Sequence, residues 1–301
     1  MAETTGISWA HATQNFWLGC TKIAPECAHC YIDRTLLRQG REPWGEIYKT
    51  KTWDKPYVWN RNLEPSGQAW RVFTCSLSDF FHVKADGWRP AAWRVIRLTP
   101  NLVYLILTKR PERIAKCLPP DWPDAYANVW LGVSTGCRQT LNKMDTLRKI
   151  PIHGDAVRWI SAEPLLEDIS QDINLEGFRW VVTGGESGDG PEYLWDAKAD
   201  WRKEFNTGGR RLMPKVWAQN LLARCTRPEF IPFLFKQATA RQSGQGSNLL
   251  GRIWHEFPPP PAGLRWAPRQ EIERDHQWNL IQIEQYKSKT EGVAHDREPI
   301  T

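Results

Sequence analysis

Short apolar runs recur along the chain, and most of them are followed by a segment with the spacing of a helix. Each run ends in small or polar residues, as strands do where they leave a sheet. Strands that alternate with helices indicate a parallel sheet with crossover connections, and six or seven such units predict an α/β barrel or open partial barrel. The predicted strands cover residues 15–18, 71–76, 102–107, 129–134, 157–161, 178–182 and 231–236, and a helix is expected over residues 214–226.

The pattern changes after residue 238. Residues 239–263 contain a Gly- and Ser-rich segment and the run Pro258 to Pro261, which are typical of loops or a linker. Residues 264–301 are polar, and a helix near residues 269–286 and a solvated tail are the two alternatives there. We therefore expect a barrel over residues 1–238, a linker region over 239–263 and a C-terminal tail.

Polar side chains stand where the predicted strands end. In parallel barrels the reactive groups lie at this end of the strands, so we expect these side chains to meet on one rim. Helix capping is the alternative role for the serines, and we favour it for Ser134, but capping does not explain a ring of charge. The set comprises Ser76, Ser78, Asp79, Thr108, Lys109, Ser134, Glu163, Glu186, Ser187 and Lys236.

Three of the seven cysteines crowd together after the first predicted strand, with the spacing Cys20-x6-Cys27-x2-Cys30. Three thiolates can hold three irons of a four-iron cluster and leave the fourth iron open. A structural zinc ion is the first alternative, although zinc prefers four protein ligands and neither His11 nor His29 makes a standard fourth. Uncoordinated thiols are the second alternative. The remaining cysteines are expected to be buried free thiols: Cys75, Cys117, Cys137 and Cys225.

Composition sets wider bounds. The 301 residues are 41% hydrophobic, which suffices for a substantial core, and no run of about 18 apolar residues or signal segment is present. We therefore expect a soluble, cytoplasmic protein without a membrane partner. The net charge of +6 and the 18 tryptophans, many beside Arg or Lys, suit a nucleic-acid surface. Trp130, Trp159 and Trp180 stand in predicted strands, however, where a place in the core is expected.

Taken in order, these motifs resemble the radical S-adenosylmethionine superfamily. The chain is more closely similar to phage- and prophage-associated three-cysteine proteins related to spore photoproduct lyase-like enzymes. It departs from the superfamily in its cysteine loop, where the usual spacing is Cys-x3-Cys-x2-Cys. The segments that carry the resemblance span nearly all of residues 7–258, at positions 17–31, 76–82, 107–111, 130–134, 161–165, 184–188, 233–237 and 254–258.

The resemblance implies a partial (β/α)6 TIM-like barrel with a C-terminal extension. It further implies a [4Fe-4S] cluster on the three cysteines and S-adenosylmethionine at the open iron, whose cleavage yields a 5'-deoxyadenosyl radical that takes hydrogen from a substrate. The expected substrate is a nucleic acid or nucleotide, in DNA repair or nucleic-acid modification. Expected partners are DNA or RNA, a reductant such as a flavodoxin or ferredoxin, and a further partner protein.

The resemblance also assigns roles to residues. His29 precedes the last cysteine, where the superfamily has an aromatic residue near the adenine; it could stack there or become a fourth metal ligand, and Tyr31 is assigned to the cofactor beside it. Ser134 joins the cofactor-binding set unless it caps a helix. Ser76, Ser78 and Asp79 are expected to bind the methionine amino group.

The Gly-Gly-Glu-Ser sequence, comprising Gly184, Gly185, Glu186 and Ser187, resembles a methionine-binding element. It follows the sixth strand rather than the second, so a ligand contact and a tight turn are both open. Lys109, Arg110 and Lys236 could bind a phosphate, and Glu163 could orient a ribose hydroxyl. The expected catalytic residues are Lys109, Glu163 and Lys236.

A second class of function stays open. The chain could be a nucleic-acid-binding protein without catalysis, in which zinc or a fully ligated iron-sulfur cluster only stabilises the N-terminal loop. The identity of the metal separates the two classes.

Overall fold

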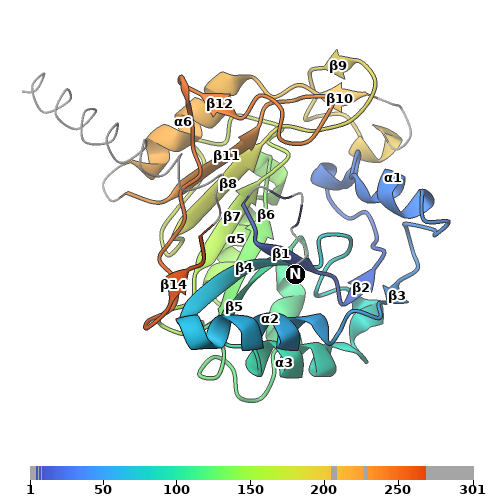
Figure 1. The fold of residues 1–301 in the computed structure, drawn as a ribbon. Helices are drawn as coiled ribbons and strands as arrows, with labels where there is room; N and C mark the ends of the chain where they lie inside the picture. The colour runs from blue at the N-terminus through green and yellow to red at the C-terminus, as the bar shows by residue number, and fades with distance from the viewer. Residues whose placement is uncertain (1–4, 6, 8, 205–208, 227–229, 269–301) are drawn as a thin grey trace, which may run out of the picture.

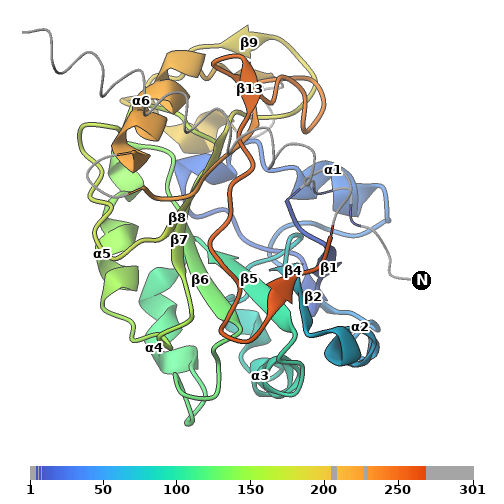
Figure 2. The same cartoon turned by 60° about the vertical axis from the view of Figure 1, so that its left-hand side comes forward.

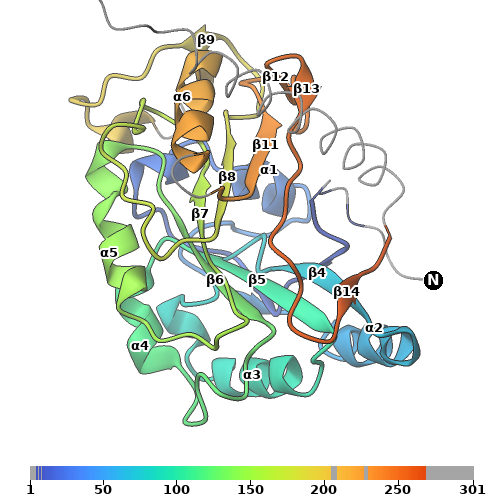
Figure 3. The same cartoon turned by 90° about the vertical axis from the view of Figure 1, so that its left-hand side faces the viewer.

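Seven parallel strands form one curled sheet, with helices packed on its convex face (Figure 1). The computed structural model describes residues 5, 7, 9–204, 209–226 and 230–268. Turning the molecule shows the curl of a half-barrel that is open on one side (Figures 2 and 3). The predicted α/β partial barrel is thereby confirmed. In spatial order the strands are β1 (Ala12–Gln14), β4 (Gln68–Thr74), β5 (Leu102–Thr108), β6 (Val129–Ser134), β7 (Arg158–Ala162), β8 (Trp180–Gly184) and β11 (Phe233–Gln237).

The convex face is covered by short amphipathic helices. In α3, for example, Ala92, Trp93 and Ile96 are buried against the sheet, whereas Arg94 and Arg97 face outward. This spacing places the apolar residues on one stripe of the helix. These helices are α2 (Lys55–Leu63), α3 (Arg89–Arg97), α4 (Ile114–Cys117), α5 (Asn142–Arg148) and α6 (Lys215–Cys225), of which α6 was predicted to within one residue at each end. Helix α1 (Ile32–Leu37) instead packs on the cysteine loop.

Tryptophans fill the concave face of the sheet. Trp130, Trp159 and Trp180 are fully buried, as predicted. The rings of Trp159 and Trp180 lie 5.0 Å apart, and Trp130 contacts Trp266 at 5.6 Å. We call this cluster the aromatic plug; it comprises Trp9, Trp130, Trp159, Trp180, Phe257 and Trp266.

A late segment of the chain, residues 254–267, crosses the open side of the half-barrel and completes the plug (Figure 2). This strap ends in β14 (Arg265–Trp266), which pairs in parallel with the beginning of β4. Arg71 of β4 lies between the rings of Phe257 and Trp266, with its guanidinium 3.8 Å and 4.9 Å from their centres.

The first predicted strand is wrong in position. The sheet takes up Ala12–Gln14, whereas the apolar run 15–18 forms β2 (Trp17–Leu18), which pairs antiparallel with β3 (Tyr48–Lys49) outside the sheet. Phe16 and Trp17 are buried against Trp53 and Phe80, so the run is apolar because it packs beneath the cysteine loop. The other six predicted strands lie within three residues of the observed ones.

Pairs of short strands also form outside the main sheet. β9 (Glu192–Tyr193) pairs with β10 (Arg210–Arg211), and β12 (Asn248–Leu249) pairs with β13 (Arg252–Ile253). The helix expected near residues 269–286 lies outside the described residues. None of the helices in the described ranges has the length and apolar character needed to cross a bilayer.

Candidate functional site

The three cysteines lie on the loop between β2 and α1, which meets the residues after β4 through the bridge between Gly19 and Ser78 and the residues after β5 through Arg110. Gly19 donates its backbone N–H to Leu77 O at 2.9 Å, and Cys20 donates to Pro43 O at 3.0 Å. Gly19 has a φ of +89°, and a Cβ atom there would overlap the carbonyl oxygen of Glu46. Only glycine therefore allows the chain to turn here and bring the cysteines to the rim of the half-barrel.

The pKa values of the cysteine thiols depend on burial and on the neighbouring cysteines. Burial raises the pKa of Cys20 to about 11 and that of Cys30 to about 12, and the charge of Cys27 contributes in both cases. Such thiols stay protonated until a metal replaces the protons. Within the described ranges, no three or more His, Cys, Asp or Glu side chains gather closely enough for a single metal ion. A set of three soft thiolates fits the donors that iron-sulfur clusters use.

Arg110 links the cysteine loop to the sheet. Its guanidinium donates to Cys20 Sγ at 3.6 Å, to Asp79 Oδ2 at 3.0 Å and to Thr21 O at 2.9 Å. Asp79 also accepts from the Thr108 hydroxyl at 2.8 Å and from the Lys109 N–H at 3.0 Å. Burial alone would raise the pKa of Asp79, but Arg110 and these donors hold it below its usual range. Both side chains predicted to meet a ligand are thus engaged with protein partners and position the loop.

Lys109 is the central cation of the rim. Burial alone would lower its pKa, but the charges that Cys27 and Cys30 carry as thiolates, together with those of Glu26 and Asp79, raise it above the ordinary lysine value. The ammonium therefore stays charged and lies near enough to two of the three thiols for its charge to act on them.

Glu26 lies beneath the cysteine loop and was assigned no role from the sequence. Its Oε1 accepts from the Gly136 N–H at 2.9 Å and from the Thr140 hydroxyl, and Lys143 Nζ lies 3.8 Å from Oε2. Although burial alone would raise the pKa of Glu26, Lys143 and Lys109 lower it. The carboxylate thus ties the loop to the end of β6 and to α5. Only the fold brings Lys143 here, so no sequence signal marked it.

His29 is fixed by an acidic partner from the other end of the sheet. Its Nδ1 lies 2.9 Å from Glu186 Oε2, and its Nε2 lies 3.4 Å from the Tyr193 hydroxyl. Both ring nitrogens thus have protein partners, which leaves the three thiols as the soft donors of the loop. Tyr193 was not identified from the sequence.

Arg211 completes this cluster and was also missed, because it lies in a short strand with no recognisable motif. It is buried and donates Nε to Glu186 Oε1 at 2.8 Å, its backbone N–H to Glu186 Oε2 at 2.7 Å, and Nη2 to Pro25 O at 3.0 Å. Burial alone would raise the pKa of Glu186, but His29 and Arg211 hold it low. The Glu186–Arg211 pair therefore anchors the cysteine loop to β10.

The glycines before Glu186 serve close packing. A Cβ atom on Gly185 would overlap the backbone of Thr239, and the Gly185 N–H donates to Gln237 O at 3.0 Å. Gly184 also approaches Gln237, and Ser187 forms a bridge with Ala240. The sequence Gly184 to Ser187 thus joins the ends of β8 and β11.

The predicted serines also have protein partners. Ser78 donates to Trp17 O at 3.0 Å, and the Ser76 carbonyl accepts from the Tyr31 hydroxyl. Ser134 donates to Glu163 O at 3.2 Å, so the expectation that it caps a helix is wrong: its hydroxyl instead joins the ends of β6 and β7.

Glu163 and Lys236 form an ion pair across the gap between the ends of β7 and β11. Both are partly exposed on the rim. Together with burial, the charge of Glu163 raises the pKa of Tyr31, the residue that follows Cys30. The cysteine loop, Lys109 and the Glu163–Lys236 pair therefore all lie at the carboxyl ends of the strands.

Comparison with known proteins adds a family and a fold likeness. A family model described as "Protein of unknown function (DUF5131)" matches residues 4–258. No curated protein matches the chain. Among solved structures, a mutant spore photoproduct lyase with a dinucleoside spore photoproduct is similar, with a TM-score of 0.42 and 12% sequence identity. The match covers 75% of this chain and 64% of that one, so it spans less than two thirds of the other protein.

Proposed function

The chain belongs to the DUF5131 family, whose description assigns no function, and we propose from its site that it is a radical S-adenosylmethionine enzyme. One observation carries the proposal: three thiols share one loop at the carboxyl rim of a parallel half-barrel, beside the cations Lys109 and Arg110. Parallel barrels place their reactive groups on this rim.

The residues of the loop would hold a [4Fe-4S] cluster through Cys20, Cys27 and Cys30. When bound, this cluster would supply the electron that cleaves S-adenosylmethionine and so generates a radical able to take hydrogen from a substrate. Arg110 donates an N–H toward Cys20, and the charge of Lys109 acts on Cys27 and Cys30, so two cations would offset the charge of three thiolates.

The substrate side of the site is the ion pair of Glu163 and Lys236. Lys236 can bind a phosphate oxygen, and Glu163 can accept a hydrogen bond from a sugar hydroxyl. Together with the net charge of +6, this pair supports a nucleotide or nucleic acid as the substrate. The assignment of S-adenosylmethionine contacts to Tyr31, Ser76 and the Gly184 to Ser187 turn is part of the same proposal.

Anaerobic reconstitution with iron and sulfide tests the proposal. We expect a four-iron electron paramagnetic resonance signal that S-adenosylmethionine perturbs, together with formation of 5'-deoxyadenosine. Both should be lost in Cys27→Ala and kept in Cys225→Ala, which removes a buried thiol at the end of α6. Stoichiometric zinc without iron would refute the enzyme and favour a metal-stabilised nucleic-acid-binding protein.

A further inference from the structure

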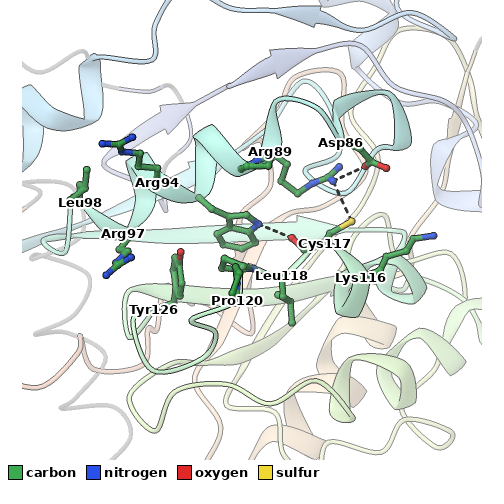
Figure 4. A pocket seen from close by; sticks show the side chains of 13 residues that line it. Asp86, Arg89, Arg94, Arg97, Leu98, Lys116, Cys117, Leu118, Pro120 and Tyr126 are labelled. Atoms are coloured by element: carbon green, nitrogen blue, oxygen red, sulfur yellow. Dashed lines mark hydrogen bonds and ion pairs between the residues drawn. The ribbon is translucent and has the colours of Figure 1, made fainter.

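A groove of about 790 Å³ opens on the convex face, between α3 and the segment that follows α4 (Figure 4). It is separate from the rim that carries the cysteines. Cations project from both of its walls, Arg94 and Arg97 from α3 and Lys116 from α4. Between them lie apolar side chains, among which are Leu118 and Pro120.

The groove carries an excess of positive charge. Its one carboxylate, Asp86, is already paired with Arg89 at 2.6 Å and with Arg113 at 2.6 Å. Arg94 and Lys116 are exposed, and no carboxylate of the described residues lies within ion-pair distance of either. Two uncompensated cations on opposite walls attract an acidic partner.

The aromatic residues favour a protein over a nucleic acid. Single-stranded nucleic acids stack their bases on exposed rings, but Trp93 and Tyr126 are only 3% and 2% exposed. Trp93 also donates its Nε1–H to Cys117 O at 2.8 Å, which fixes it in the wall. The exposed apolar surface comes instead from Leu98, which is 53% exposed, and from the prolines, and these suit the apolar side chains of a polypeptide.

One end of the groove contacts the segment that supports the cysteine loop. Arg89 donates to His82 O at 2.7 Å, and the His82 ring lies 3.3 Å from the Thr21 hydroxyl. Thr21 follows Cys20 directly. A protein seated in the groove would therefore be separated from the segment of the first cysteine by the His82 contact.

We propose that this groove docks an acidic one-electron carrier protein. The assignment rests on the proposed function: the carrier is oxidised by one electron, the cluster held by the three cysteines is reduced by one electron, and no bond forms or breaks. Arg94 and Lys116 act as the docking charges, and Leu98 and Leu118 as the apolar contacts.

Stopped-flow reduction of the reconstituted full-length protein by flavodoxin hydroquinone tests this assignment. The double variant R94E/K116E should slow reduction at least about tenfold at low ionic strength, since steering charges change association rates about 10- to 1,000-fold. Reduction by dithionite should be unchanged. The matched control K215E/R224E, which makes the same charge change on α6, should reduce at nearly the wild-type rate.

The other outcomes overturn the assignment in distinguishable ways. A chain that forms no cluster refutes the proposed function and the docking site together. A cluster-bearing chain that flavodoxin reduces equally fast in R94E/K116E and wild type refutes the docking site alone. If the same variant instead loses affinity for a single-stranded oligonucleotide, the groove is a nucleic-acid site.

Discussion

Glu256→Gln tests whether a carboxyl of the strap is neutral in the folded protein. Glu256 is 6% exposed; its Oε2 accepts from the Phe233 N–H at 3.2 Å, and Arg252 lies 3.5 Å from its Oε1. The thiol of Cys225 is also near, and its pKa is raised by burial, so it carries no charge. Burial raises the pKa of Glu256 from 4.5 to about 7, although Phe233 and Arg252 oppose the change.

The sign of the effect follows from this raised pKa. As pH rises above about 4.5, the unfolded chain loses the Glu256 proton while the folded protein keeps it, so stability falls until about pH 7 and then levels off. At about 1.4 kcal/mol for each pH unit, the loss amounts to about 3 kcal/mol at most. Glutamine keeps the shape and the acceptor for Phe233 but cannot ionise.

Urea denaturation at pH 8 and pH 4.5 measures this loss. We expect Glu256→Gln to be more stable than wild type by about 2–3 kcal/mol at pH 8 and equal to it at pH 4.5. The exposed Glu176→Gln should show no such pH dependence. A variant that is less stable than wild type at pH 8 would refute the reasoning, because it would mean that Arg252 stabilises the ionised carboxylate and that the pKa of Glu256 is lowered in the folded protein.

Three further predictions concern the site. Gly19→Ala should abolish iron binding on reconstitution, whereas Gly45→Ala, with a similar φ of +84° but open space for a Cβ, should retain it; equal iron contents would contradict the packing argument. Glu186→Gln should lower the free energy of unfolding by about 3 kcal/mol, because the buried Arg211 then keeps only Glu204, 3.3 Å away, as an ionic partner; urea denaturation at pH 7 measures the loss, and an unchanged stability would contradict the argument. Lys109→Met should retain iron but lower the reduction potential of the reconstituted protein below that of Lys109→Arg, because a cation beside the thiolates favours the more negative reduced state; equal potentials would show that the lysine charge does not act on the site.

The sheet was predictable where its strands are buried on both faces. Such strands read as continuous apolar runs, as in β5 and β6, and the helices between them keep the parallel order. The first strand escaped because it is only Ala12–Gln14, with a buried polar Gln14, while a more apolar run next to it packs beneath a loop. Apolar character reports burial, and it does not say which element is buried.

The site was predictable only as far as local spacing reaches. The cysteine loop and the charged residues after each strand follow from the chain, because parallel strands bring their ends together. The partners that hold them do not: Glu26 meets Lys143, and Glu186 meets Arg211, through contacts that exist only in the folded protein. The sequence also could not show that the carboxylate oxygens of Asp79 accept hydrogen bonds from Arg110 and neighbouring donors.

The strap also determines when folding can be completed during synthesis of the chain. Trp130, Trp159 and Trp180 are synthesised well before residues 254–267, which bring Phe257 and Trp266 onto them and pair β14 with β4. A nascent chain that has already made all seven sheet strands still shows the ribosome exit site an uncovered aromatic surface, and such surfaces attract chaperones and other unfolded chains. The aromatic surface of this protein is therefore covered only when the strap has been synthesised.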